Sequence, residues 1–175
     1  MSGHRGSREV ASLLALGSNL GKREETLLRA VERLGGCGGL RVEAVSSLYE
    51  TEPEGGGGGN LFINAACAVA TSLGPLDLLA LCLDIEREFG RRRDGPSRDR
   101  TIDIDLLAYG DRVIREADLV VPHPRLRDRL FVLAPLVEIR PDFPLPPDGA
   151  SVRDVLRGHS GGGWIRRVSS RGETR

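Results

Sequence analysis

The sequence of 175 residues has no excess charge of either sign, because 25 lysine and arginine side chains balance 25 aspartates and glutamates. A neutral chain disfavours a strongly basic nucleic-acid-binding protein, although it permits a local basic patch. Aromatic residues are also scarce, at 4%, which removes most of the base-stacking surface that RNA-binding modules use. With 39% hydrophobic and 29% charged residues, the composition is that of one folded globular unit.

Cysteines and long apolar runs are few as well. Cys37, Cys67 and Cys82 are isolated, odd in number and without metal-ligand spacing, which argues against a disulfide framework. Cys67 and Cys82 lie in apolar stretches and are expected to be small core residues. The apolar run Val10–Leu16 is too short to span a bilayer, so we expect a buried strand there, no membrane partner and a cytoplasmic location.

Two residue types are in excess. Glycine occurs 23 times, and Lys22 is the only lysine, so 24 of the 25 basic residues are arginine. Arginine binds phosphate through two parallel hydrogen bonds, which lysine cannot do. A codon bias towards G and C explains the totals, so the positions of these residues carry more information than their number.

Hydrophobic periodicity predicts the main elements. Strands are expected at Val10–Leu16, Arg41–Glu50, Leu61–Thr71 and Thr101–Tyr109, and helices at Lys22–Leu34 and from Pro75 to about Phe89. Leu28 and Leu76 are expected on the apolar faces of the two helices. The order predicts a ferredoxin-like α/β (α+β) core, βαββαβ, with helices packed on a mostly antiparallel sheet. We expect a flexible N-terminus at residues 1–8, a single domain at 9–158 and a loose C-terminal tail at 159–175.

The connecting segments carry their own signals. Turns are expected at Gly17–Asn19 and at Gly110–Asp111, the second leading as a hairpin into Arg112–Ile114. The helical stretch Leu130–Ile139 contains Pro135 and is expected to be interrupted there, because proline removes a backbone donor.

The sharpest local feature is the pair Asp103 and Asp105. Alternate side chains of a strand share a face, so both carboxylates are expected to point away from the core, with Cα atoms roughly 6.5–7 Å apart. Two carboxylates this close repel each other unless a cation intervenes. Mg²⁺ accepts such a pair and takes its other ligands from water and phosphates. An ordinary solvent-facing strand explains the motif equally well.

Five arginines lie just before this pair, within ten residues: Arg91, Arg92, Arg93, Arg98 and Arg100. Cations next to a bound metal neutralise a polyphosphate, whereas a solvated charged loop is the alternative. The position beside the aspartate pair favours the functional interpretation. The motif G-x-x-x-x-G-K-[ST] is missing, which excludes a P-loop enzyme.

Three smaller features are ambiguous when taken singly. His123 is flanked by two prolines and is most typical of a turn. Phe62 and Asn64 share one face of a strand, where a ring and an amide suit a flat heterocycle, but a core phenylalanine beside a strand-end asparagine is the commoner pattern. Phe131 is equally ambiguous.

Several segments together match, in order, those of one known family. They are Leu16–Gly21, Ser46–Thr51, Phe62–Ala66, Ile85–Glu86 with Gly90–Arg91, Arg100–Asp105, Val121–Pro124, and Arg129 with Phe131 and Pro135–Leu136. Over about residues 11–148 the chain thereby resembles the 6-hydroxymethyl-7,8-dihydropterin pyrophosphokinase (HPPK) family. The resemblance implies a monomeric enzyme of tetrahydrofolate biosynthesis with a ferredoxin-like core. Such an enzyme moves pyrophosphate from ATP to the pterin hydroxymethyl group and releases AMP.

The resemblance also implies roles for single residues. Asp103 and Asp105 match ligands of two Mg²⁺ ions that bridge the ATP phosphates, and Asp105 is also a candidate general base. The positions that match ATP contacts are Arg91, Arg93, Arg100, His123, Arg129 and Glu86. The positions that match the pterin site, where two rings sandwich the pterin, are Gly17, Thr51, Phe62, Asn64 and Phe131. The implied catalytic residues are Asp103, Asp105, Arg91 and Arg100.

Two departures from the family pattern concern loops. Ser97–Asp99 lacks the aromatic cover that members often have, which leaves the register of Arg91–Arg93 open. Glu52 stands where members often have proline, and an acid there can weaken substrate binding. Gly55–Gly59 and Arg91–Arg98 are expected to be mobile substrate lids that become ordered on binding.

Three alternatives stay open at this point. One is another Mg²⁺-dependent nucleotidyl- or phosphotransferase that uses the same aspartate pair. Another is a ferredoxin-like RNA-binding module, which requires exposed aromatics and a basic face that this composition does not favour. The third is a non-catalytic relative in the folate pathway.

Overall fold

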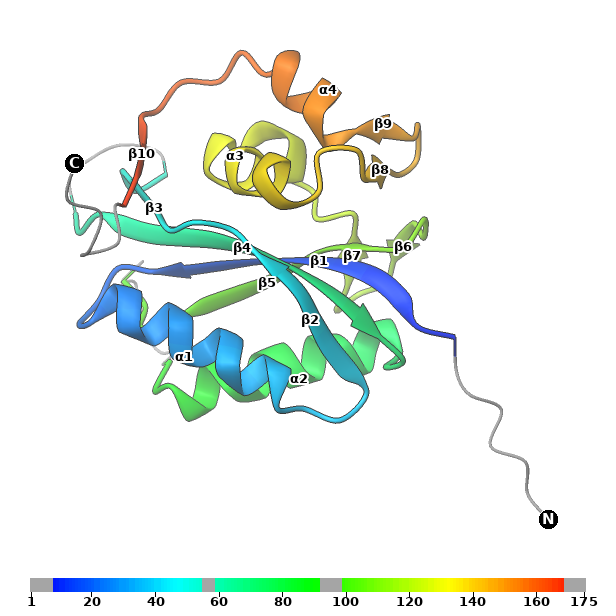
Figure 1. The fold of residues 1–175 in the computed structure, drawn as a ribbon, viewed down its shortest axis with the longest axis horizontal. Coiled ribbons are helices and arrows are strands. Elements are labelled where there is room, and N and C mark those ends of the chain that lie inside the picture. The colour runs from blue at the N-terminus through cyan, green and yellow to red at the C-terminus, as the bar shows by residue number, and fades with distance from the viewer. Residues whose placement is uncertain (1–7, 55–58, 92–98, 169–175) are drawn as a thin grey trace.

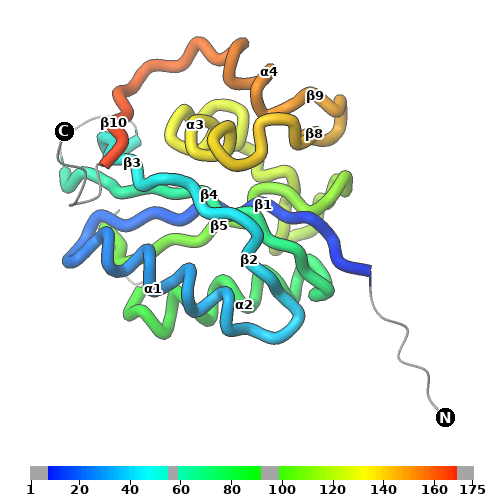
Figure 2. The backbone as a smooth tube through the Cα atoms, viewed as in Figure 1, coloured from blue at the N-terminus to red at the C-terminus, as the bar shows by residue number. Residues whose placement is uncertain are grey.

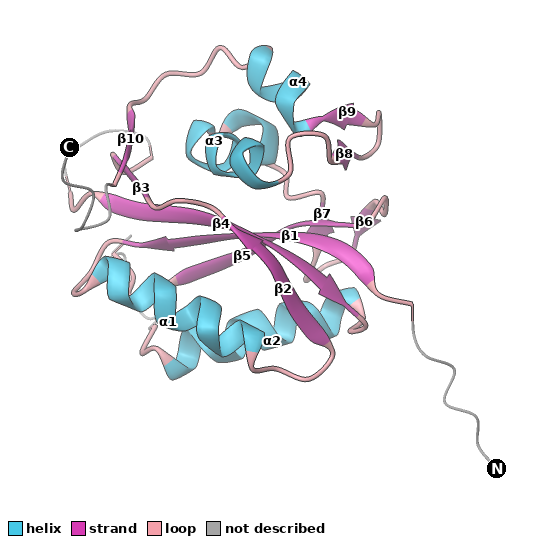
Figure 3. Cartoon of the chain, in the orientation of Figure 1, coloured by secondary structure: helices cyan, strands magenta, loops and turns pink. Residues whose placement is uncertain are grey.

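The computed structural model describes residues 8–54, 59–91 and 99–168, and the fold below concerns these ranges. Its centre is a six-stranded sheet in the order β10-β3-β4-β1-β5, in which β2 also pairs with β4 and all pairs are antiparallel (Figure 3). The strands are β1 (Val10–Ser18), β2 (Leu40–Val45), β3 (Tyr49–Thr51), β4 (Phe62–Thr71), β5 (Asp103–Tyr109) and β10 (Ile165–Arg167). The spatial order β5-β1-β4-β2 is that of a βαββαβ core, which confirms the ferredoxin-like prediction.

Helices cover both faces of this sheet (Figures 1 and 2). On one face lie α1 (Arg23–Gly35) and α2 (Pro75–Glu88), and on the other lie α3 (Leu130–Ile139) and α4 (Val152–Arg157). Two hydrophobic cores result: Leu14 and Leu16 of β1 belong to the first, and Leu13 belongs to the second. Because both faces are buried, β1 reads as a continuous apolar run rather than an alternating one.

The strand predicted over Arg41–Glu50 is two strands, β2 and β3, which both pair with β4. They are separated at Ser46, whose side-chain oxygen accepts the Ala66 N–H at 2.9 Å and whose own N–H donates to the Ala66 carbonyl at 2.9 Å. The next N–H, that of Ser47, donates to the Glu138 carboxylate of α3 at 3.1 Å. Side chains thus interrupt the strand through long-range contacts that an alternating pattern does not reveal.

The first two helices lie where predicted, but their buried faces differ from the prediction. Leu28 of α1 is 51% exposed and Leu76 of α2 is 49% exposed, so neither belongs to an apolar face. The residues that α2 buries are Leu78, Cys82, Ile85 and Glu86. Apolar residues occur on all sides of the first half of α2, so their spacing does not show which face of the helix is buried.

Pro135 does not interrupt α3, contrary to the prediction. Proline removes one backbone N–H and crowds the preceding turn. However, α3 lies between the sheet and α4, and its residues Val132, Leu133 and Leu136 are buried in the second core. Tertiary packing therefore maintains a helix that local preference alone would break.

The glycine-based turn predictions are partly wrong. Gly17 and Ser18 continue β1, and in the segment Gly17–Gly21 the backbone takes a positive φ, of +64°, at Gly21. Gly110 does turn the chain after β5, but the next strand, β6, pairs with β7 instead of β5. The remaining short elements are β6 (Ile114–Arg115), β7 (Val120–Val121), η1 (Leu126–Asp128), β8 (Pro144–Leu145) and β9 (Ala150–Ser151), with β8 and β9 forming a second hairpin.

The tail predicted to be loose after Gly158 returns to the sheet. β10 pairs with β3 in a register that aligns Ile165 with Thr51, and the Val168 N–H donates to the Leu48 carbonyl at 2.8 Å. A three-residue strand held by backbone bonds to a distant partner has no signature in its own sequence. The prediction is therefore wrong for the residues up to Val168.

The expectation that Cys67 and Cys82 are core residues is confirmed. Cys67 of β4 and Cys82 of α2 are fully buried in the core. Burial raises the pKa of both thiols to about 12, so neither is a reactive thiolate at neutral pH. Within the described ranges, no helix combines the length and apolar character that crossing a bilayer requires.

Candidate active site

A cavity of about 480 Å³ opens where the end of β1 and the starts of β4, β5 and α3 meet. Gly17 lies at its centre, because it pairs with Asn64 of β4 on one side and with Asp103 of β5 on the other. The predicted site residues that line the cavity are Gly17, Thr51, Phe62, Asn64, Arg100, Asp103, Asp105, Arg129 and Phe131. The sheet thus brings the amide and the carboxylates together across one glycine.

The absence of a side chain at Gly17 keeps this cavity open. A Cβ atom there would lie 3.0 Å from the Asn64 side-chain oxygen and 3.8 Å from the Phe62 ring. The Asn64 amide is in turn oriented by Thr51, whose hydroxyl oxygen accepts its N–H at 2.8 Å. Gly17 is therefore required for space beside the ring and the amide, not for a turn.

Two aromatic rings line the cavity, and each lies beside an arginine. The Arg100 guanidinium is 5.8 Å from the centre of the Phe62 ring, and the Arg129 guanidinium is 5.6 Å from the centre of the Phe131 ring. At this separation a cation is attracted to the face of an aromatic ring. The aromatic and cationic parts of the site therefore hold one another in place.

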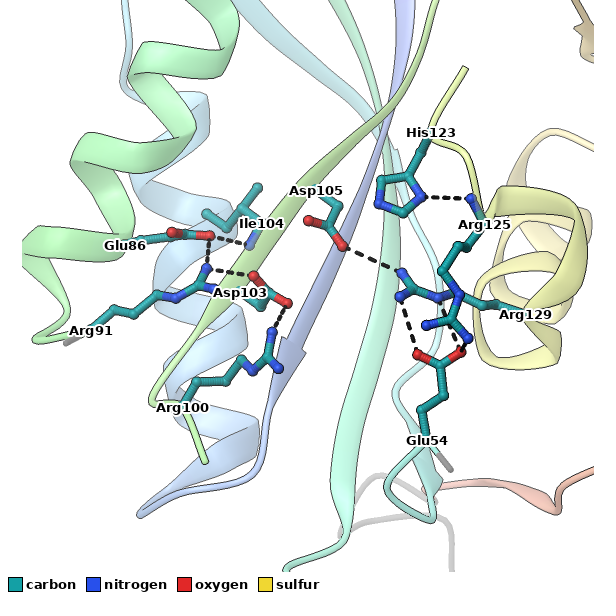
Figure 4. Close-up of polar contacts among 10 residues, drawn as sticks. All are labelled: Glu54, Glu86, Arg91, Arg100, Asp103, Ile104, Asp105, His123, Arg125 and Arg129. Carbon is teal, nitrogen blue, oxygen red and sulfur yellow. Dashed lines mark hydrogen bonds and ion pairs between the residues drawn. The ribbon is translucent and has the colours of Figure 1, made fainter. Parts of the chain in front are cut away.

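Asp103 and Asp105 both face the cavity, while the residue between them is buried in the core, as the alternation predicts (Figure 4). Asp103 forms ion pairs with Arg91 and with Arg100. Asp105 has the Arg129 guanidinium 3.7 Å away. Two of the predicted arginines therefore gather on the first aspartate and a third lies beside the second.

The two aspartates differ in how their charge is balanced. Burial, together with the negative charge of Asp103, raises the pKa of Asp105 to about 6, against the opposing influence of Arg129. Ionising Asp105 is costly because the group is buried and, secondly, because Asp103 adds negative charge beside it. A cation beside Asp105 would therefore favour its charged form.

Glu86 lies behind the aspartates rather than in the cavity wall. Its side chain is only 2% exposed, accepts the Ile104 N–H at 2.7 Å and forms an ion pair with Arg91. A buried carboxylate needs such partners, because burying an unpaired charge is strongly unfavourable. Glu86 thereby ties α2 to the strand that carries Asp103 and to one of the arginines that contact it.

Asn19 anchors the segment that leads into β5. Its N–H donates to the Arg100 carbonyl at 3.2 Å, and its side-chain oxygen accepts the Arg100 N–H at 2.7 Å. Its side-chain N–H donates to Asp99 at 2.7 Å. The segment Gly17–Asn19 is too common a pattern to interpret alone. In the structure, Gly17 leaves space in the cavity beside Phe62 and Asn64, and Asn19 positions the segment that leads into β5.

His123 follows β7 and lies near Asp105 (Figure 4). Its Nδ1 accepts the Arg125 N–H at 3.2 Å, so the proton of the neutral ring is on Nε2. Burial, and then the positive charge of Arg129, lower the pKa of His123. The ring is therefore neutral at pH 7 and offers a hydrogen-bond donor.

Glu54 and Arg125 line the cavity but were missed at the sequence level. Glu54 forms ion pairs with Arg125 and with Arg129. The available signal was their position: Glu54 directly precedes the glycine run, and Arg125 directly follows the Pro-His-Pro motif. Glu52, the departure from the family pattern, also lines the cavity and accepts the indole N–H of Trp164.

Part of the predicted site lies outside the described residues. This applies to Arg92, Arg93 and Arg98, and to Gly55–Gly58 of the glycine run. The prediction that these segments act as substrate lids therefore stays a prediction.

Asp103 and Asp105 are the side chains that suit a metal ion. Among the described residues, no group of three or more histidines, cysteines, aspartates and glutamates is placed to hold one. Two carboxylates without a third protein ligand suit Mg²⁺, which keeps positions for water and substrate phosphates. The costly ionisation of Asp105 agrees with a cation at this place.

Fold and site together define a class of protein. Paired carboxylates flanked by arginines are suited to neutralise a polyphosphate, and a ring with a neighbouring amide suits a flat polar heterocycle. Both open into one cavity. This is the arrangement of a phosphoryl- or pyrophosphoryl-transfer enzyme with a heterocyclic acceptor.

Comparison with known proteins then gives the family. Residues 13–141 match the family described as 7,8-dihydro-6-hydroxymethylpterin-pyrophosphokinase (HPPK), and the chain belongs to it. It is 45% identical over 143 residues to the 2-amino-4-hydroxy-6-hydroxymethyldihydropteridine pyrophosphokinase of Methylorubrum extorquens, covering 82% of this chain and 89% of that protein. It is 47% identical over 126 residues to the enzyme of that name from Bacillus subtilis, covering 72% and 75%.

Solved structures agree on the fold. A wild-type HPPK-DHPS chain of Plasmodium falciparum with pteroate superposes with a TM-score of 0.70 at 15% identity, covering 86% of this chain. The present chain spans only 44% of that longer chain, so the likeness concerns the fold alone. Family membership confirms the predicted reaction: the chain is a pyrophosphokinase that transfers pyrophosphate from ATP to 6-hydroxymethyl-7,8-dihydropterin in folate biosynthesis.

Proposed function

We propose that the cavity holds both substrates at once, with the pterin between the two phenylalanine rings and the ATP phosphates beside the aspartate pair. The observation that carries this proposal is the register at Gly17, which places Asn64 and Asp103 on either side of one residue. Neighbouring strands are about 4.8 Å apart, so these two residues lie about 10 Å apart. That span allows a pterin bound at one to reach a phosphate bound at the other.

On the pterin side, Phe62 and Phe131 stack on the faces of the ring. Asn64 forms hydrogen bonds with the ring edge and is oriented for this by Thr51. Gly17 leaves the space beside them. The position of these side chains in the cavity and the hydrogen bond between Asn64 and Thr51 support the pterin-binding roles expected from the family resemblance.

On the ATP side, the phosphates are bound by arginines and by the neutral His123. The arginines assigned to this role are Arg91, Arg93, Arg100 and Arg129. Glu86 acts as a positioning residue, because it contacts Arg91 and the β5 backbone instead of lining the cavity. This role refines the direct ATP contact that the resemblance implies for Glu86.

Asp103 and Asp105 are the residues assigned to hold Mg²⁺, with two ions expected from the family resemblance. Bound Mg²⁺ neutralises phosphate charge and makes the attacked phosphorus more electrophilic. The support from this chain is the convergence of two carboxylates in the cavity and the raised pKa of Asp105, about 6.

In the reaction, the pterin hydroxyl oxygen bonds to the β-phosphorus of ATP. The bond from that phosphorus to the oxygen bridging the α- and β-phosphates breaks, and AMP leaves with the bonding electrons. Arg91 and Arg100 balance the charge of the phosphates, and the two rings hold the acceptor in line. Positioning and charge neutralisation supply most of such catalysis, so a strong general base is not required. The proton that the hydroxyl group loses goes to Asp105, the candidate acceptor.

We further propose that the catalytic domain, predicted at residues 9–158, also includes β10, and that the protein acts as a monomer in the cytoplasm. The two cores share one sheet and extend from β1 to α4, which supports a single folding unit. Nine of the predicted site residues line one cavity within a single chain, which agrees with a monomeric enzyme.

The nucleotide product tests this proposal. The purified protein with Mg²⁺, ATP and 6-hydroxymethyl-7,8-dihydropterin is expected to release AMP in step with pterin consumption. Release of ADP alone supports the rival phosphotransferase and refutes the proposed reaction. A folded protein that binds both substrates without forming AMP is the non-catalytic relative.

A further inference from the structure

The Glu54 carboxylate is bound by two arginines of the same cavity (Figure 4). Its two oxygens accept hydrogen bonds from Nη2 of Arg129 at 3.1 Å and from Nε of Arg129 at 3.3 Å. A further hydrogen bond comes from Arg125. Two parallel N–H groups on one anion are also how a guanidinium binds a phosphate.

These three side chains differ in how firmly the fold holds them. The side chain of Arg129 is 15% exposed and lies at the start of α3, whereas Arg125 is 53% exposed on the preceding segment. Glu54 is 33% exposed and follows β3 on a loop. The carboxylate is therefore the exchangeable partner, since it can leave without unpacking the core.

We propose that Glu54 occupies the place of a substrate phosphate in the ligand-free protein, and that Arg125 is a further phosphate-binding residue alongside Arg129. The inference rests on the proposed binding of ATP phosphates beside Asp105. The Arg129 guanidinium is 3.7 Å from Asp105 and simultaneously binds Glu54, so it lies between the proposed phosphate site and this carboxylate. A carboxylate and a phosphate cannot use the same N–H groups.

Glu54 has a physical reason to be there before ATP arrives. Two guanidinium groups gathered on one acceptor repel each other unless an anion lies between them. The carboxylate supplies that anion and keeps both arginines turned into the cavity. When a phosphate with more charge replaces it, the arginines are already in place, but the carboxylate must be displaced, which weakens ATP binding.

The test measures the affinity of the full-length chain for α,β-methylene-ATP with Mg²⁺ by calorimetry, without pterin. Glu54→Gln keeps the shape and removes the charge, and is expected to lower the Kd about 3- to 10-fold. Arg125→Gln is expected to raise the Kd by about the same factor, because one phosphate contact is lost. In the Arg125→Gln background, Glu54→Gln is expected to have a smaller effect, since half of the competing contact is gone.

Asp148→Asn is the matched control. It removes the charge of a carboxylate that Arg127 binds through two N–H groups, but neither Asp148 nor Arg127 is among the residues that line the cavity. If both variants lower the Kd equally, a general charge effect replaces the proposed competition. An unchanged or raised Kd for Glu54→Gln overturns the proposal, because Glu54 would then serve only to orient the arginines.

Two further measurements keep these outcomes distinct from a failure of the proposed function. Thermal unfolding of each variant checks that it is folded at the temperature of the titration. Arg129→Gln is expected to weaken nucleotide binding whatever Glu54 does. If Arg129→Gln leaves the Kd unchanged, the phosphates do not bind beside Arg129. That result refutes the proposed ATP site itself, not only the proposed competition by Glu54.

Discussion

Two clusters in this cavity have the same composition, two arginines around one carboxylate, but are built differently. The strand cluster consists of Asp103, Arg91 and Arg100, with Glu86 buried behind it. The loop cluster consists of Glu54, Arg125 and Arg129. In the first, the carboxylate belongs to the sheet; in the second, it belongs to a loop. The same chemical group is therefore a fixed part of the site in one place and a replaceable one in the other.

The difference follows from what lies behind each carboxylate. Asp103 is held by the β5 backbone, and Glu86 fastens that backbone to α2 from the buried side. Glu54 lies on the loop after β3 rather than on a strand of the sheet, and its carboxylate forms ion pairs with Arg125 and Arg129. Removing charge from the strand cluster should destroy function, whereas removing it from the loop cluster should adjust affinity.

The largest effect is expected from removing either cavity aspartate. Asp103→Ala and Asp105→Ala should each lower AMP formation by about a thousandfold or more, because the Mg²⁺ assigned to these carboxylates would no longer be held beside the phosphates. Circular dichroism should show a folded protein, since both side chains face the cavity. Asp148→Asn, which removes a surface aspartate paired with Arg127, is the control and should keep full activity. Near-normal turnover in either alanine variant would contradict the metal assignment.

The second effect concerns the support of the strand cluster. Glu86→Gln still accepts the Ile104 N–H but loses the ion pair with Arg91, so the free energy of unfolding should fall by about 1–3 kcal/mol. Activity should fall as well, and the KM for ATP should rise. Glu88→Gln on the same helix breaks an exposed ion pair with Arg33 and should change neither the free energy of unfolding nor the activity. Equal urea stability of both variants would show that Glu86 does not hold the cluster.

The third effect falls on the pterin side. Gly17→Ala places a methyl group 3.0 Å from the Asn64 side-chain oxygen, so the amide must move. The KM for the pterin is expected to rise about 10-fold, with a smaller change in the KM for ATP. Gly35→Ala is the control, because its nearest contact is a side-chain atom of Val42 at 3.8 Å. A larger effect on ATP than on pterin would place the pterin elsewhere.

The smallest effect is expected on how the thermal stability depends on pH. Because the pKa of Asp105 is raised from the ordinary value of 3.8 to about 6, its ionised form destabilises the folded state in full above pH 6, and the penalty fades as the pH falls from about 6 towards 3.8. Asp105→Asn should therefore raise the Tm of the metal-free protein by a few degrees at pH 8, by a smaller amount at pH 5 and by almost nothing below about pH 3.8. Asp148→Asn should act in the opposite direction at pH 8, since Arg127 lowers the pKa of Asp148 to about 2. A gain that does not depend on pH would rule out charge repulsion as the cause.

Local patterns in the sequence predicted the parts of the fold that depend on local physics. The strand and helix order, the outward alternation of Asp103 and Asp105, and the burial of Cys67 and Cys82 all follow from periodicity and apolar runs. The predictions were wrong where contacts between residues distant in the sequence determine the secondary structure. Ser46 interrupts a strand through a bond to Ala66, and β10 exists only because β3 offers it a partner.

The site shows the same division. The resemblance supplied most of the residues that line the cavity, but not why Glu54 and Arg125 belong there. Their interaction joins residues that are 71 positions apart, and neither lies in a motif by itself. Glu86 illustrates the converse: a motif residue whose contacts place it behind the strand instead of in the cavity.

Transfer of pyrophosphate by the aspartate site is tested most directly by ³¹P NMR of the complete reaction mixture with Mg²⁺, ATP and 6-hydroxymethyl-7,8-dihydropterin. We expect AMP and a pterin product with two coupled phosphorus signals, in equal amounts, and neither product with Asp103→Ala. A pterin product with one phosphorus signal alongside ADP, or AMP formation that persists in Asp103→Ala, would contradict this expectation.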